Sequence, residues 1–320
     1  MEHALTLIVD EEHCDPPVEL NHDGSIRALT FSASGEYLWS ASDKGLRMWR
    51  VEDGEEMARL EPQGGVECFA MSKDERWIAV GTILNTIVVW DTRTCEKVFS
   101  VEGGRWGVDF SPDSSRLVSA STKGDFGDIS WTIRDIATGK QVQTFHHEVA
   151  RNNFKLPTIY AVKYSPQGDR IATAIEHSIR VWDSNDGRLL VRVNTSCKGL
   201  FWCDDHLFVA SGHEIQQINA STGSQMSKWL VSYDHLPYMA LPQHGGFIAY
   251  STEHMVTFWD TATHTQLGRI YYPLGIGPIA LSPDNRFLAT GSRRRDGKII
   301  IKSLPHVAAS IRLIFHCGIS

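Results

Sequence analysis

Long hydrophobic runs are the first feature that this sequence lacks. None of its apolar stretches approaches the roughly 20 residues that a membrane-spanning helix needs. The apolar run at residues 4–9 is shorter than the core of a signal peptide and is followed by acidic residues. We therefore expect a chain that neither crosses a membrane nor binds one.

Paired cysteines and an excess of positive charge are also missing. The six cysteines show no Cys-x-x-Cys spacing and no evident pairing, which favours a reducing, intracellular environment. We expect a cytoplasmic protein, with the nucleus as the alternative. The formal net charge of −7 gives no global attraction for nucleic acid, which is therefore a disfavoured partner.

Sequence signatures of catalysis are absent as well. The chain has no phosphate-binding G-x-x-x-x-G-K-[ST], no H-E-x-x-H and no G-x-S-x-G. The glycine-rich stretch Gly103–Gly107 follows no strand-to-helix pattern. His146–Glu148 looks like a fragment of a metal site, but adjacent histidines on a strand would point to opposite sides. A solvated loop is therefore the favoured interpretation. A looser group has a spacing that suits no zinc site: Cys197, Cys203, His206 and His213. The sequence predicts no catalytic residue, no cofactor and no metal.

What the sequence does contain is a repeated unit. A β-rich run ends in Trp-Asp and is followed by a short polar turn such as Ser184–Gly187. Upstream lies a bend of the Ser-Pro-Asp type, as at Ser111–Asp113. The dipeptide occurs at Trp90-Asp91, Trp182-Asp183 and Trp259-Asp260, with Trp49-Arg50 as a variant. Such a unit predicts strands joined by tight turns.

Seven copies of this unit can be counted, and most begin about 40 residues after the previous one, the spacing of a four-stranded propeller blade. They begin near residues 26, 66, 105, 159, 197, 236 and 276. Trp-Asp with both turn types, repeated at one period, resembles the WD40-repeat β-propeller family over roughly residues 18–304. The family's Gly-His dipeptide appears only as Asn21-His22, and three copies lack the Trp.

The resemblance implies an all-β fold, a seven-bladed β-propeller of four-stranded antiparallel blades. An N-terminal strand near residues 18–20 would complete the last blade and close the ring. The expected organisation is a lead-in at 1–17, the propeller at 18–307 and a tail at 308–320. Residues 4–9 are a candidate added strand, and the role of the tail stays open.

The same resemblance implies which residues hold the blades together. In the first copy, His22, Ser40 or Ser42, Asp43 and Trp49 match the types that form a buried hydrogen-bonded chain in such blades. His22 with Asp43 and a serine superficially looks like a hydrolase triad, but its repeat position favours a structural role. The Trp-Asp dipeptides of the other copies are expected to be structural too: Trp90, Asp91, Trp182, Asp183, Trp259 and Asp260.

The function that the resemblance implies is a non-enzymatic scaffold, a monomeric propeller within a complex. It would bind proteins or peptides through the loops of one face. Exposed Trp, Tyr and Arg dominate interface energetics, and the expected anchors are Arg105, Trp106, Tyr160 and Tyr238. The alternative for Trp106 and Tyr160 is packing between blades. A sensor or targeting module that binds peptide, small ligand or nucleic acid is the second candidate, and a propeller enzyme the third.

Two further segments are candidates for partner contact. The insertion at residues 146–155, which carries Arg151 and Phe154, is expected to set specificity, with plain length variation as the alternative. The basic run at residues 293–295 includes Arg293 and Arg294. It reads as a solvated turn, a contact for an acidic partner, or a nucleic-acid or localisation signal.

Overall fold

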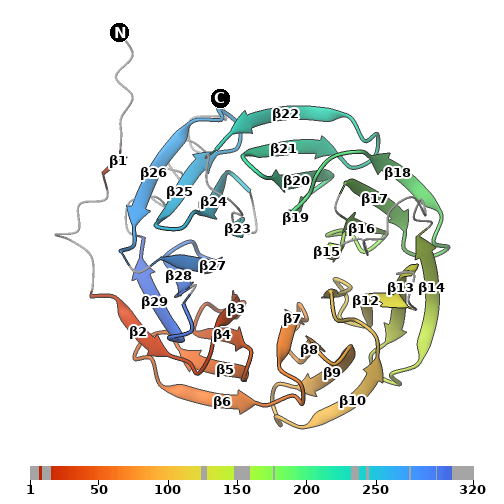
Figure 1. The fold of residues 1–320 in the computed structure, drawn as a ribbon, viewed down its shortest axis with the longest axis horizontal. Coiled ribbons are helices and arrows are strands. Elements are labelled where there is room, and N and C mark those ends of the chain that lie inside the picture. The colour runs from red at the N-terminus through yellow and green to blue at the C-terminus, as the bar shows by residue number, and fades with distance from the viewer. Residues whose placement is uncertain are drawn as a thin grey trace. The chain divides into compact units, whose positions relative to one another are not determined.

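The structure is a computed structural model that describes residues 7–8, 16–123, 128–147, 159–175, 177–231, 238–242, 245–273, 275–292 and 294–304. Strands are the only regular elements in these ranges, and they form seven antiparallel four-stranded sheets, one of them extended by a short fifth strand. This is a seven-bladed β-propeller, as the sequence predicts (Figure 1). The chain packs as two compact units.

The first unit comprises residues 1–42, 46–58 and 236–320, and holds three of the sheets for the most part. One contains β23 (Tyr238–Ala240), β24 (Phe247–Ser251), β25 (Met255–Asp260), β26 (Gln266–Tyr271) and β1 (Leu7–Ile8). The next contains β27 (Ile276–Leu281), β28 (Phe287–Ser292), β29 (Lys298–Ser303) and β2 (Val18–Asn21). The third contains β3 (Ile26–Phe31), β4 (Tyr37–Ser42), β5 (Gly45–Arg50) and β6 (Glu56–Leu60).

The second unit comprises residues 43–45 and 59–235, and holds four sheets. The first two contain β7 (Val66–Met71), β8 (Trp77–Thr82), β9 (Thr86–Asp91) and β10 (Lys97–Glu102), then β11 (Gly107–Phe110), β12 (Arg116–Lys123), β13 (Asp128–Asp135) and β14 (Gln141–His147). The other two contain β15 (Ile159–Tyr164), β16 (Arg170–Ile175), β17 (Ser178–Asp183) and β18 (Leu189–Val193), then β19 (Gly199–Cys203), β20 (His206–Ser211), β21 (Glu214–Asn219) and β22 (Gln225–Leu230).

The last blade is completed by the N-terminal strand β2, which pairs antiparallel with β29. Leu20 lies opposite Ile299, and Val18 opposite Ile301. Figure 1 shows the red strand β2 beside the blue strand β29. Leu20 is buried in one cluster with Ile299 and Trp49. The predicted closing strand is therefore confirmed, and it bonds the two ends of the repeat array into one sheet.

Residues 7–8 of the early apolar run also form a strand. This strand, β1, pairs in parallel with β26, with Leu7 opposite Gly268 and Ile8 opposite Arg269. It extends the sheet of β23–β26 beyond its fourth strand. The outer edge of that sheet is thus partly covered by the protein's own N-terminal segment, which reduces the exposed row of backbone groups.

The Ser-Pro-Asp bend is held by its own side chains. The Ser111 hydroxyl donates to Asp113 (2.5 Å) and accepts the N–H of Arg116 (2.9 Å). The bends at Ser72 and Ser282 repeat both bonds. Serine and aspartate favour turns because they offer the backbone such local partners.

The aspartate after the repeated Trp caps the following turn. Asp183 accepts the N–H groups of Asn185 (2.8 Å) and Asp186 (3.3 Å). The turn ends at Gly187, whose φ of +74° favours glycine, and whose Cβ would stand 1.9 Å from the Phe145 ring. Corresponding residues accept in the same way in other copies: Asp91, Asp135, Asn219 and Asp260.

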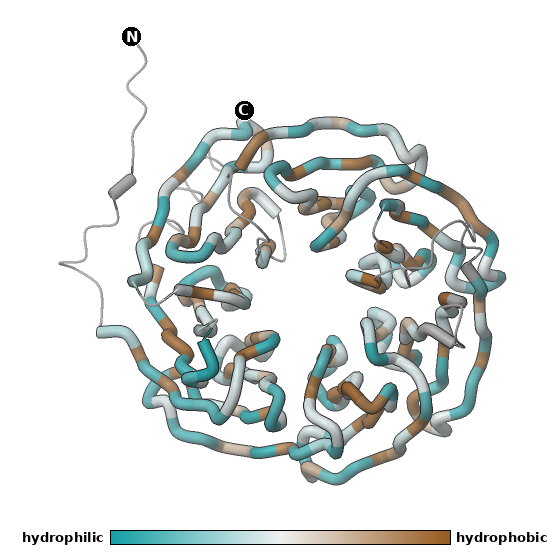
Figure 2. The backbone as a smooth tube through the Cα atoms, viewed as in Figure 1, coloured by the Kyte–Doolittle hydropathy of each residue, from teal (hydrophilic) through white to brown (hydrophobic). Residues whose placement is uncertain are grey.

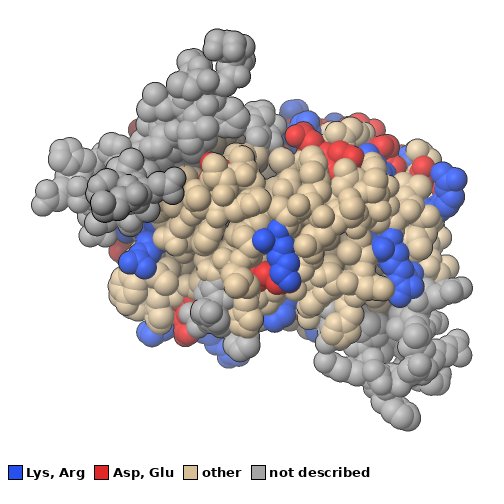
Figure 3. Space-filling view, turned by 90° about the horizontal axis from the view of Figure 1, so that it is seen from above, with Lys and Arg blue, Asp and Glu red and all other residues tan. Residues whose placement is uncertain are grey.

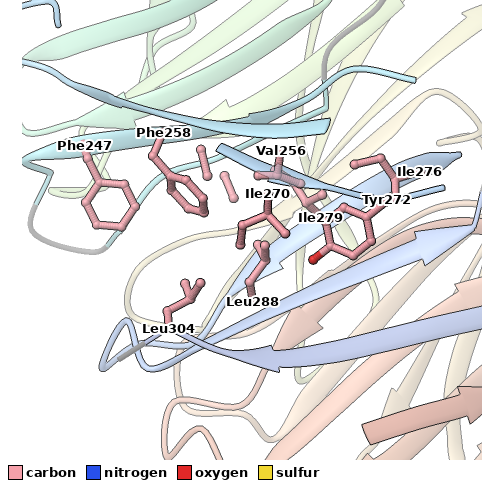
Figure 4. Close-up of a cluster of buried hydrophobic side chains, with 11 residues drawn as sticks. Phe247, Val256, Phe258, Ile270, Tyr272, Ile276, Ile279, Leu288 and Leu304 are labelled. Atoms are coloured by element: carbon pink, nitrogen blue, oxygen red, sulfur yellow. The ribbon is translucent and has the colours of Figure 1, made fainter. Parts of the chain in front are cut away.

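The core lies between neighbouring sheets. Inner strands such as β8 and β16 are buried at successive positions and so on both faces, whereas the outer strand β10 is largely exposed. Figure 2 shows hydrophilic and hydrophobic residues mixed along the outer strands. Figure 4 shows one inter-sheet cluster, in which Phe247 and Phe258 of one sheet share a core with Leu288 of the next.

The closing strand gives a stability prediction. Leu20→Ala should lower the free energy of unfolding by about 2–5 kcal/mol, because it removes a buried side chain from an inter-sheet cluster. Urea denaturation followed by tryptophan fluorescence measures this change. Glu19→Ala, on the same strand but exposed, is the matched control and should change it by less than 0.5 kcal/mol or so. Equal effects of the two variants would contradict a closing role for the buried face of β2.

The turn carboxylates give a pH prediction. The Ser111 hydroxyl and the Ser115 N–H hold the pKa of Asp113 below its ordinary value, and the N–H of Asn185 does the same to the pKa of Asp183. A lowered native pKa adds stability above the unfolded pKa of about 3.9 and loses it as the pH falls through the native value.

Unfolding free energies from urea titrations at pH 7, 5, 4 and 3 should therefore be level down to pH 5 and fall steeply below pH 4. The double variant Asp113→Asn/Asp183→Asn should show a shallower fall, with Glu52→Gln, an exposed turn carboxylate, as the control. If the unfolding free energy of the double variant falls below pH 4 as steeply as that of the unaltered protein, these two carboxylates are not the source of the fall.

Candidate protein-interaction surface

The residues expected to be structural include two tryptophans whose indoles are anchored by a hydroxyl. The Trp49 N–H donates to the Ser40 hydroxyl (2.8 Å), and the Trp182 N–H donates to the Thr173 hydroxyl (2.9 Å). In both copies the hydroxyl residue lies on the second strand, nine positions before the Trp. In the copy with Trp90 that position is Gly81, so this anchor is missing there.

His22 is buried, but its bonds go to the backbone. Its Nδ1 lies 2.9 Å from the carbonyl of Asp23, and no described residue bonds its Nε2. Burial lowers the pKa of His22, and the Arg47 charge lowers it further, against the raising effect of the Asp23 carbonyl. Its ring centroid is 6.3 Å from that of Trp49. The hydrogen-bonded chain expected here thus has the Trp49–Ser40 link but no bond from His22 to either residue.

The other expected members lie nearby or in the other unit. Ser42 donates to the Asp23 carbonyl (2.7 Å). Asp43 falls in the second compact unit. Trp90 is buried, and Trp259 is half-buried. Asp260 is buried and bonds the N–H groups of Ala262 and Thr263.

Arg105 and Trp106 form a stacked pair just before β11. The Arg105 guanidinium lies over the Trp106 ring, 4.7 Å from its centre. Trp106 is half-buried and packs on a cluster that includes Ile159 and Val162 of the next sheet. Packing of this ring between two sheets is the alternative that the sequence left open. Arg105 is likewise only partly exposed, and its Nε is buried.

Tyr160 and Tyr238 differ in exposure. Tyr160, on β15, is half-buried and packs on the cluster that contains Ala172 and Leu200. Tyr238 begins β23 in the first unit and is 43% exposed. Three of the expected anchors therefore lie in the second unit, on the adjoining sheets of β11 and β15, and Tyr238 belongs to the first.

The remaining candidates fall mostly outside the described ranges. Arg151, Phe154 and Arg293 are not among the described residues. Arg294 is exposed, and its backbone N–H donates to the Ser292 hydroxyl (3.1 Å). Within the described ranges there is no group of three or more His, Cys, Asp or Glu that could hold a metal ion, and no helix long and apolar enough to cross a membrane.

Two interactions between sheets were not foreseen from the sequence. The Lys163 ammonium lies 3.0 Å from Asp109, and the Arg170 guanidinium 2.7 Å from Asp205. The residues of the first pair are 54 positions apart, so no local pattern could have paired them. Such partly exposed pairs add little to stability.

Comparison with known proteins agrees with the repeated Trp-Asp unit and the sheets that it forms. The family model described as "WD domain, G-beta repeat" matches residues 16–50, 54–91 and 139–183. The protein contains WD40 repeats. Their positions coincide with copies of the Trp-Asp unit, and the resemblance stated from the sequence is thereby confirmed.

Curated proteins similar to this WD40 propeller include subunit I of eukaryotic translation initiation factor 3. The chain is 31% identical to that of Neosartorya fischeri over 124 residues, which are 37% of this chain and 36% of the relative. It is 23% identical over 177 residues to a guanine nucleotide-binding protein subunit beta of Oryza sativa subsp. japonica, 51% of this chain and 45% of the relative. The matches thus span about a third to a half of these relatives.

A solved structure agrees with the fold along nearly the whole sequence. The β-propeller domain of Cps50 (Swd1) from Myceliophthora thermophila superposes with a TM-score of 0.76. The alignment covers 91% of this chain and 99% of that domain, at 14% identity. At such an identity the likeness shows the fold alone.

Basic side chains do not gather on the face of the protein that Figure 3 shows. Figure 3 shows Lys and Arg side chains scattered among uncharged residues, with no broad basic patch on the face in view. Arg76, Arg105 and Arg286 lie over neighbouring aromatic rings. Nucleic-acid binding through the phosphate backbone needs a broad basic surface, and this face does not present one.

The Trp49–Ser40 bond gives a testable coupling. Ser40→Ala should lower the free energy of unfolding by about 1–3 kcal/mol, because it leaves a buried indole N–H without its acceptor. In the background of Trp49→Phe, which has no N–H, the same change should cost clearly less. A double-mutant cycle by urea denaturation measures the difference, and a coupling energy near zero would contradict the role of this bond.

Proposed function

We propose that this protein is a non-enzymatic scaffold that binds segments of partner proteins at the adjoining starts of β11 and β15, and that Arg105 is the main anchor. The carrying observation is the Arg105–Trp106 stack. The ring is held by the cores of two sheets, so the guanidinium is presented on a support that binding need not order. A preorganised anchor loses little conformational entropy on association.

The local chemistry favours an acidic or carbonyl-rich partner segment at this point. The Arg105 Nε is buried without an acceptor among the described residues, so a partner would bond this guanidinium through its terminal nitrogens. Arginine offers its donors in a planar fork that suits carboxylate and carbonyl oxygens. Tyr160 adds an aromatic group on the neighbouring sheet, and arginine with aromatic groups is the composition of interface hot spots.

The relatives support a place within a larger assembly. The curated proteins named above are described as subunits, one of a translation initiation factor and one of a guanine nucleotide-binding protein. We extend this to the present protein as one propeller in a multiprotein complex. A cytoplasmic site of action agrees with the relative named as a translation initiation factor. Tyr238, and Arg151 and Phe154 of the insertion, remain candidate contacts of this scaffold.

The test compares two arginines that stack on tryptophans. Arg105→Ala removes the proposed anchor, and Arg76→Ala removes a guanidinium that lies 4.3 Å over Trp77, at the polar bend before β8. Partners captured with the unaltered protein from its native extract are identified by mass spectrometry, purified, and titrated against both variants by calorimetry.

Arg105→Ala should weaken binding of the purified partner at least tenfold, while Arg76→Ala leaves it within twofold. Both variants must melt cooperatively, within a few degrees of the unaltered protein. If the two variants bind alike, the start of β11 is not the partner site. If no protein is captured in repeated experiments, the scaffold function itself is contradicted.

A further inference from the structure

A pocket lies in the first unit between the sheet of β26 and the sheet of β27–β29 and β2. Its volume is about 190 Å³, enough for several water molecules or for one amino-acid side chain. Its lining comes from the β26–β27 connection and from the strands β2, β27, β28 and β29: Glu19, Tyr272, Pro273, Gly275, Ile276, Thr290, Ser292, Lys298 and Ile300. Much of this lining is apolar, with a few polar groups among it, which is the usual composition of a ligand site.

The strand register explains why polar groups meet here. Glu19 lies opposite Ile300, and Ile300 lies opposite Thr290, so these three residues form one row across the sheet. Lys298 and Ser292 stand at the next positions on the same face, because side chains alternate along a strand. The opposite face, with Leu20 and Ile299, packs into a different hydrophobic cluster.

Tyr272 is the unusual member of this lining. It is 3% exposed and belongs to the apolar cluster in Figure 4, where its hydroxyl points away from Ile276. Burial raises the pKa of Tyr272, and the nearby Thr290 hydroxyl offsets part of this effect. Yet no described residue forms a well-shaped hydrogen bond with its hydroxyl. A buried hydroxyl without a partner is costly, and phenylalanine would fill the same space without that cost.

The pocket offers several hydrogen-bond donors beside the single carboxylate of Glu19 among its described lining residues. The Thr290 hydroxyl already donates to the Ile300 carbonyl (3.4 Å). The Ser292 hydroxyl accepts the N–H of Arg294 (3.1 Å), so its own proton remains to be donated. Lys298 forms no ion pair with a described residue, and the Lys302 ammonium lies 5.2 Å from the centre of the Tyr272 ring. Two hydroxyl protons and an ammonium group in one pocket suit an anionic acceptor.

We propose that this pocket binds a carboxylate of a peptide. Tyr272, Ser292 and Lys298 would donate to the carboxylate, and the exposed Glu19 would accept a peptide N–H at the rim. Ile276, Ile300 and Pro273 would contact an apolar stem. Capture of a terminal carboxylate by convergent donors is a known mode of peptide recognition. The required group is present both at the C-terminus of a polypeptide and on the side chains of aspartate and glutamate.

This inference deepens the proposed scaffold function with a second contact, and it rests on that function only for its biological meaning. The pocket shares no residue with the start of β11. Arg105→Ala should therefore leave peptide binding at the pocket unchanged, so either proposal can fail without the other.

The test titrates three peptides into the full-length protein, labelled with ¹⁵N, and follows amide shifts by NMR. The probes are N-acetyl-Gly-Gly-Leu with a free carboxylate, the same peptide as its C-terminal amide, and N-acetyl-Gly-Glu-Gly-amide. The free acid should shift amides of β2, β28 and β29, and its amide should bind at least tenfold more weakly. Binding of the third peptide alone would also support the proposal, and would identify the carboxylate as that of a side chain.

Matched variants separate binding from folding. Tyr272→Phe and Lys298→Met should each weaken the binding of the probe peptide at least tenfold. Tyr271→Phe, at the neighbouring tyrosine that is 63% exposed, and Lys73→Met, at an exposed lysine, should not. Tyr272→Phe should also melt at the same temperature as the unaltered protein or higher.

Three outcomes would overturn the proposal. Equal binding of the acid and the amide would exclude carboxylate recognition. No binding of any probe at millimolar concentration would show that the pocket holds water only. A lower melting temperature for Tyr272→Phe than for Tyr271→Phe would show that the hydroxyl has a structural partner.

Discussion

Inner strands that are buried on both faces are the constraint on which the rest of this structure depends. β16 is buried at five successive positions, and β28 likewise. Such a sheet cannot present one face to water, as an antiparallel sheet with alternating sequence can, so it must be covered on both sides. The observed cores follow from this need. One cluster joins Val118 and Trp131 to Ile171, and another joins Ala172 to Leu207, so each joins one sheet to the next.

Stability is therefore distributed over nearest-neighbour contacts, as in repeat proteins generally. The sheet most sensitive to the loss of a strand is the one whose fourth strand is far away in sequence. β2 supplies that strand to β27–β29, and it does so with a single fully buried side chain, Leu20, flanked by the half-buried Val18. Local turn chemistry supports the rest. Serine and aspartate side chains bond the backbone at the bends of several repeats, and they do so without help from the core.

This division explains how far the sequence predicted the structure. The number of blades and the turn residues follow from patterns within 40 residues, because each is set by local hydrogen bonds and strand alternation. The closing strand pairs residues at opposite ends of the repeat array, and it was expected only from the family resemblance. The indole anchor was also encoded, as a hydroxyl nine residues before Trp49 or Trp182. The surface contacts, in contrast, were not predicted by local patterns. Whether Trp106 faces water or a neighbouring sheet depends on contacts with β15, more than 50 residues away, and the Tyr272 pocket requires β2, β28 and β29 to meet.

Adjacent tyrosines show why binding groups on such a fold can be separated from stabilising ones. Tyr271 and Tyr272 end β26 and begin the next connection, and strand alternation turns one outward and the other into the inter-sheet core. Trp49 and Tyr272 are both buried aromatic residues with a polar atom, but the indole of Trp49 meets its acceptor within its own sheet. The hydroxyl of Tyr272 has none among the described residues. Phenylalanine would fill the same space without the cost of an unpartnered hydroxyl, so this hydroxyl is the feature of Tyr272 that the proposed carboxylate ligand would explain.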